Sequence, residues 1–89
     1  MIRYRTSAEA ASAIMQDGAV VLHMGTKRYY SLNESGALIW SLLEQNISEE
    51  EIVNRLVSRY EVDGNVAADA LASLVVKLAD ANLVQPVAA

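Results

Sequence analysis

The sequence predicts an α+β fold in which a three-stranded antiparallel β-meander is followed by three α-helices. Residues 11–32 contain short apolar blocks separated by glycine-containing turns, which is typical of short antiparallel strands. From Glu34 to Leu83 the apolar residues recur at helical spacing, which indicates helices. The 89 residues have room for one domain.

The strands of the meander are expected at residues 11–16, 19–24 and 28–32. Asp17 and Gly18 are a preferred pair for the first turn, because both central positions of such a turn need positive φ. Residues 25–27 supply the second turn. The block 19–22 is apolar on both faces, which favours a strand covered on two sides.

The first helix is expected to begin after Asn33, whose side chain can accept hydrogen bonds from the first turn, and to be apolar nearly all round. The second begins at the capping box of Ser48 and Glu51 and is amphipathic. The third runs from about Val66 to Ala81, followed by a left-handed Asn82.

Two terminal segments are expected to lie outside this framework. Residues 1–10 show no clear period and are interpreted as an arm, which either docks on the domain or frays. The sheet then occupies residues 11–32, the three-helix part 33–84 and a tail 85–89, since Pro86 is expected to end ordered structure.

The composition argues against an enzyme. The chain has no cysteine, which excludes a thiolate nucleophile and a cysteine-ligated metal. The single histidine, His23, has no carboxylate close in sequence and is expected to be structural. The four glycines are scattered, so no phosphate-binding loop is formed. We therefore expect no cofactor, no metal and no catalytic residue.

Charge and hydropathy limit the partners. A net charge of −4 with dispersed basic residues argues against nucleic-acid binding. The longest apolar run is far shorter than the ~20 residues that cross a membrane. The lack of cysteine is consistent with a reducing compartment, so we expect a cytoplasmic protein.

The third helix has more apolar surface than one core face needs. Its expected core stripe consists of Leu71, Leu74, Leu78 and Ala81. Its polar stripe consists of Asp69, Ser73, Lys77 and Asp80. The apolar residues left over are Ala68, Ala72, Val75, Val76 and Ala79. Either the rest of the chain covers them or a partner does.

The last strand of the meander is expected to keep a free edge where a guest peptide can pair. Tyr30 and Leu32 are expected to point inward and Tyr29 to the other face. The basic pair at residues 27–28 is interpreted as a solvated turn, or as a charge that steers an acidic peptide.

The chain resembles a known family in its order of elements and in several short motifs. These motifs are Asp17-Gly18, the run 25–33 ending in Tyr-Tyr-x-Leu-Asn, the run 36–40 ending in Ile-Trp, and matches at 51–53, 60–63, 71–78 and 83–84. Over residues 11–84 the pattern is similar to the PqqD family of pyrroloquinoline quinone biosynthesis. The resemblance implies a winged helix-turn-helix fold.

The resemblance also implies a function. PqqD-like proteins are recognition elements for ribosomally synthesised and post-translationally modified peptides (RiPPs), and they bind the leader segment of the precursor. The leader joins the sheet antiparallel to the third strand and places side chains against the third helix, which is β-augmentation. The expected peptide-binding residues are Arg28, Tyr29, Tyr30, Ser31, Leu32, Ala68, Ala72, Val75, Val76 and Ala79.

The implied second partner is a modifying enzyme. It would be a radical S-adenosylmethionine enzyme in pyrroloquinoline quinone assembly, or a leader peptidase in lasso-peptide maturation.

Two other functions remain open from the sequence. A winged-helix DNA-binding regulator would need basic residues on the third helix, which carries only Lys77 against Asp69 and Asp80. A structural subunit that dimerises through its sheet edge is the other alternative.

Overall fold

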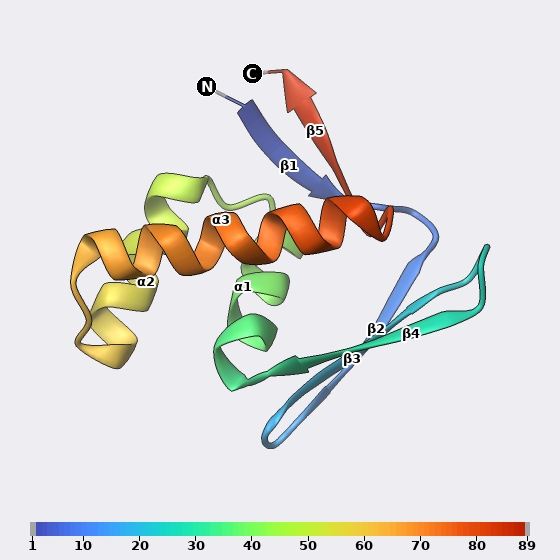
Figure 1. Cartoon of the computed structure of the whole chain (residues 1–89), viewed down its shortest axis with the longest axis horizontal. Helices are drawn as coiled ribbons and strands as arrows, with labels where there is room; N and C mark the ends of the chain where they lie inside the picture. The colour runs from blue at the N-terminus through green and yellow to red at the C-terminus, as the bar shows by residue number, and fades with distance from the viewer. Residues whose placement is uncertain (1, 89) are drawn as a thin grey trace.

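The computed structural model describes residues 2–88 (Figure 1). The elements in chain order are β1 (Ile2–Thr6), β2 (Ala10–Met15), β3 (Gly18–His23), β4 (Arg28–Asn33), α1 (Glu34–Glu44), α2 (Glu49–Tyr60), α3 (Gly64–Asp80) and β5 (Val84–Ala88). The α+β prediction of a meander followed by three helices is confirmed. A second, two-stranded sheet of β1 and β5 is added to it.

The meander has the strand order β2-β3-β4, with both pairs antiparallel. Its first turn lies one residue earlier than predicted, because the loop consists of Gln16 and Asp17, and Met15 pairs with Gly18. Gly18 is instead the first residue of β3, where a Cβ atom would overlap the carbonyl oxygen of Leu32. Close approach of two backbones therefore requires this glycine.

The N-terminal arm docks as a strand, and the prediction that Pro86 ends ordered structure was wrong. β1 replaces the expected arm and pairs antiparallel with β5, which occupies the expected tail. Pro86 lies opposite Tyr4 in this pair, and a two-stranded ribbon tolerates proline because each strand has an outer side without ladder hydrogen bonds. The ribbon is anchored by Leu83 and Val84, which are 0% and 2% exposed.

Side-chain caps begin the three helices near the expected positions. Asn33 Oδ1 accepts from the Gly36 amide at 2.8 Å, and Ser48 Oγ accepts from the Glu51 amide at 3.3 Å. Asp63 caps α3, which begins two residues before the predicted start. Asn82 has φ of 59°, as expected for a left-handed residue after the helix.

The core is built around α1, whose Trp40 is fully buried. Its apolar sequence correctly predicted a central helix, since Ile39, Leu42 and Leu43 are buried as well. His23 is buried at the end of β3: its Nδ1 accepts from the amides of residues 25 and 26, and its Nε2 lies 3.6 Å from a carboxylate oxygen of Glu9.

One expectation about β3 fails. Ala19 and Val21 are 1% and 0% exposed because they face the helices. Val20 and Leu22 alternate with them and are only half-buried. The helices cover one face of the meander, and within residues 2–88 Figure 1 shows no element against the opposite face. The strand is therefore covered on one side, not on two.

Candidate functional site

β4 is an edge strand of the meander. It pairs with β3 from Arg28 opposite His23 to Asn33 opposite Gly18, and among the described residues no strand pairs with its other side. The predicted free edge is therefore present, and its backbone N–H and C=O groups are available for an added strand.

A cleft of about 430 Å³ separates this edge from the C-terminal half of α3. Its strand side is residues 29–33, and its helix side is Leu74, Lys77 and Leu78. The side-chain orientation on β4 agrees with the sequence: Tyr30 and Leu32 pack against the core, whereas Tyr29 is 73% exposed.

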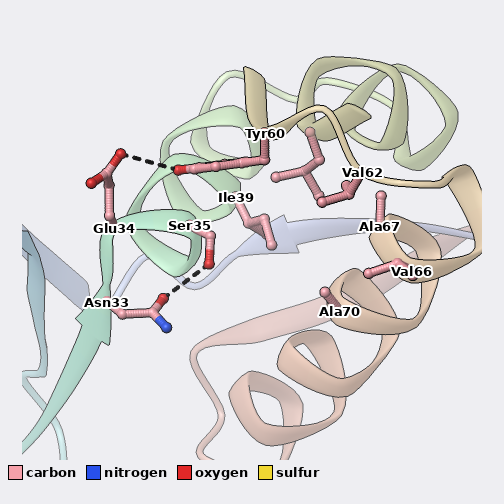
Figure 2. Close-up of a pocket in the computed structure, with 10 residues that line it drawn as sticks. Asn33, Glu34, Ser35, Ile39, Tyr60, Val62, Val66, Ala67 and Ala70 are labelled. Carbon is pink, nitrogen blue, oxygen red and sulfur yellow. Dashed lines mark hydrogen bonds between the residues drawn. The ribbon is translucent and has the colours of Figure 1, made fainter. Parts of the chain in front are cut away.

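A pocket of about 400 Å³ lies where the start of α1, the end of α2 and the start of α3 meet (Figure 2). Ile39 and Ala67 are buried and form its floor. Tyr60, Val62 and Val66 stand around it, and Val66 is 56% exposed. The interior is therefore an apolar surface open to solvent.

The polar groups on the pocket rim are already paired. Glu34 Oε1 accepts from Arg59 at 3.3 Å and from the Tyr60 hydroxyl at 3.4 Å. Asn33 Oδ1 accepts from the Ser35 hydroxyl at 3.1 Å. Because these groups satisfy one another, an apolar side chain can enter the pocket without leaving a polar atom buried and unpaired.

The cleft and the pocket lie next to each other, because Asn33 lines both. On the helix side Val66, Ala70, Leu74 and Lys77 line them at spacings of four, four and three, which is one face of a helix. We call the two hollows together the β4–α3 groove. It offers a hydrogen-bonding edge beside an apolar pocket.

Comparison with known proteins gives the family. The family model described as "Coenzyme PQQ synthesis protein D (PqqD)" matches residues 18–84. The chain belongs to the PqqD family. Among curated protein sequences, none matches the chain significantly.

Two solved structures resemble this PqqD-family chain closely. The structure described as TbiB1 in complex with the TbiA(beta) leader peptide is 34% identical and superposes with a TM-score of 0.88, covering 96% of this chain and 99% of that one. Lasso peptide synthetase B1 complexed with the leader peptide is 30% identical, with a TM-score of 0.85 and coverage of 94% and 99%. The predicted winged helix-turn-helix fold is confirmed.

The structure places the α3 residues of the site expected for this PqqD-family chain outside the β4–α3 groove. Ala68 and Ala72 line a separate hollow against α2. Val75 is 4% exposed and belongs to the core, and Ala79 also packs against the core. Val76 is exposed but does not line the groove. None of these five expected residues lines the β4–α3 groove.

The position of α2 explains why these α3 residues lie outside the groove. α2 lies across the face of α3 that carries Ala68, Leu71 and Ala72. Leu78 is in the core, as expected from the sequence, and Leu74 packs against the core; both residues also line the cleft beside β4. The four-residue repeat of Val66, Ala70 and Leu74 was the available signal.

Lys77 is the single charged side chain lining the cleft beside β4, and no ion pair engages it among the described residues. Within those residues no cluster of three potential metal ligands occurs, and no helix is long and apolar enough to cross a membrane. The groove can therefore supply hydrogen bonds, apolar contact and one positive charge to a ligand.

Proposed function

We propose that this PqqD-family chain is a non-catalytic RiPP recognition element, which binds the leader segment of a precursor peptide and delivers it to a modifying enzyme. The observation that carries the proposal is the unpaired β4 edge lying along a groove with an apolar pocket at one end. The leader peptides named for the two similar structures support a peptide as the occupant.

The leader adds a strand antiparallel to β4. Its backbone pairs with residues 28–32, and alternate side chains turn toward α3. One of these side chains lies near Leu74 and Lys77 in the cleft, and an apolar side chain further along occupies the pocket at Ala70. Strand pairing sets the register, and the pocket selects the sequence.

The magnitudes show why the pocket is needed. A handful of main-chain hydrogen bonds contributes about 0.5–1.5 kcal/mol each. Ordering a flexible peptide costs roughly 2–5 kcal/mol, which cancels most of that gain. Burying ~200 Å² of apolar surface adds about 5 kcal/mol. When both parts act together, the middle of these ranges leaves about 6 kcal/mol, which corresponds to a Kd of roughly tens of micromolar.

The modifying enzyme belongs to the same pathway as the precursor. One similar structure is a lasso peptide synthetase component, which favours a leader peptidase over a radical S-adenosylmethionine enzyme as the partner. We place this assembly in the cytoplasm.

Fluorescence anisotropy with a labelled synthetic leader tests the proposal. The probes are the leader of the precursor encoded beside this chain's gene and the TbiA(beta) leader, with a scrambled peptide as control. Hydrogen exchange on the same complex should show slower exchange of alternate amides in β4. Binding no tighter than that of the scrambled peptide, or protection confined to β2, would contradict the proposal.

A further inference from the structure

The face of the meander that points away from α1 is apolar. It carries the apolar residues Ala11, Ala13, Met15, Val20, Leu22 and Tyr29, which we call the outer sheet face, and the polar residues Ser31 and Asn33 lie at its β4 edge. Cross-strand partners lie on the same side of a sheet, and the pairs Ala11–Leu22, Ala13–Val20 and Leu22–Tyr29 place these residues together.

This face is open to solvent. Tyr29 and Met15 are 73% and 53% exposed, and Val20 and Leu22 are half-buried. None of the residues that β2, β3 and β4 direct to this side is charged. An antiparallel sheet with one solvated face normally alternates apolar and polar residues, and that alternation is missing in β2 and β3 on this side. A contiguous exposed apolar surface indicates an interaction site.

We propose that the outer sheet face is the docking surface for the modifying enzyme that acts on the bound peptide. This inference rests on the proposed function. β4 joins the two surfaces, because it contributes Tyr29 to the outer sheet face and its free edge to the peptide. The added strand extends the same sheet, so alternate side chains of the peptide lie beside Tyr29 on the outer side. A protein docked there contacts the peptide and the sheet together.

The size of the face, together with the peptide strand beside it, favours a transiently docked enzyme over a permanent second copy of the chain. Three strands of six residues cover about 14 by 20 Å in projection, roughly 300 Å². A stable protein interface buries about 800 Å² on each partner, so this face is too small to hold a permanent homodimer. The peptide strand widens it by about a third. Docking is therefore weak without the leader and stronger with it.

The absence of charge on this face determines a second property. Because apolar contact drives the association, its affinity is insensitive to salt, in contrast to a contact between charged patches. A carboxylate placed in the centre of the face must lose its water on docking, which is strongly unfavourable without a partner.

Biolayer interferometry tests the inference. The full chain is immobilised, and the analyte is the modifying enzyme encoded beside this chain's gene. Binding is measured with and without the leader peptide. The enzyme should bind the loaded wild-type protein about tenfold tighter than the free protein, a typical coupling between sites. Leu22→Glu, and Ala13→Glu as a milder second variant, should lower enzyme affinity about tenfold or more. Val76→Glu, at an exposed α3 position outside both surfaces, is the matched control and should change it less than about twofold.

Leader binding, measured by anisotropy without the enzyme, should be the same in all four proteins. Unchanged enzyme affinity in both sheet variants would overturn the inference, as would a wild-type protein that binds no enzyme in either state. A wild-type dimer in sedimentation that Leu22→Glu converts to a monomer would assign the face to a second copy, which also overturns it. Failure of the wild type to bind the leader would count against the proposed function, and this readout does not involve the outer sheet face.

Discussion

Filling the apolar pocket should abolish its contribution to peptide binding without harming the fold. Ala70 is exposed at the pocket wall, on the groove side of α3. The series Ala70→Val, Ala70→Leu and Ala70→Phe places increasing side-chain volume in the space that the peptide side chain needs. Because Ala70 is not part of the core, the added atoms displace solvent and not packed neighbours.

The pocket volume sets the size of the effect. A hollow of about 400 Å³ with an apolar floor accommodates one large apolar side chain. Burying such a side chain contributes about 1.5–3 kcal/mol. Losing all of it weakens binding by about 10- to 150-fold, since each 1.4 kcal/mol is a factor of ten. Ala70→Phe should approach this loss, and Ala70→Val should lose severalfold at most.

Anisotropy titrations of the labelled leader measure the series, and urea unfolding checks that the free energy of unfolding is retained. Val76→Phe is the control, because it adds an aromatic side chain at an exposed position of the same helix outside the groove. Equal losses for Ala70→Phe and Val76→Phe, or an affinity that does not change along the Ala70 series, would refute the pocket as the anchor site.

Three further outcomes follow from the geometry. Lys77→Glu should weaken binding of a leader with an acidic residue facing the cleft. It should also reverse the salt dependence of the Kd, because an attraction that salt weakens becomes a repulsion that salt relieves; an unchanged salt dependence would argue against that contact. Asn33→Ala removes the α1 cap and should lower the free energy of unfolding by about 1 kcal/mol in a urea titration, whereas Asn54→Ala on the exposed side of α2 should not. Gly18→Ala should lower the free energy of unfolding by more than Asn33→Ala does, because the added Cβ would overlap the Leu32 carbonyl oxygen. A urea unfolding midpoint equal to that of the wild type would contradict the close approach of β3 and β4 at this position.

Local signals in the sequence were sufficient for most of the secondary structure. Asn33 and Ser48 accept hydrogen bonds from amides three residues further along, so the first two helix starts depend on neighbours in the chain. The alternation within residues 28–32 likewise orients Tyr30 inward and Tyr29 outward. The free edge of β4 and the family could also be predicted, because the motifs that indicate them are short and contiguous in the sequence.

Contacts between segments far apart in the sequence could not be predicted from such local signals. The pairing of Ile2 with Ala88 joins opposite ends of the chain, and no turn residue indicates it. The face of α3 that meets β4 depends on where α2 lies, because several apolar stripes on one helix are equivalent until a neighbour covers one of them. The groove and the uncovered outer sheet face therefore emerge only when the elements are assembled in three dimensions.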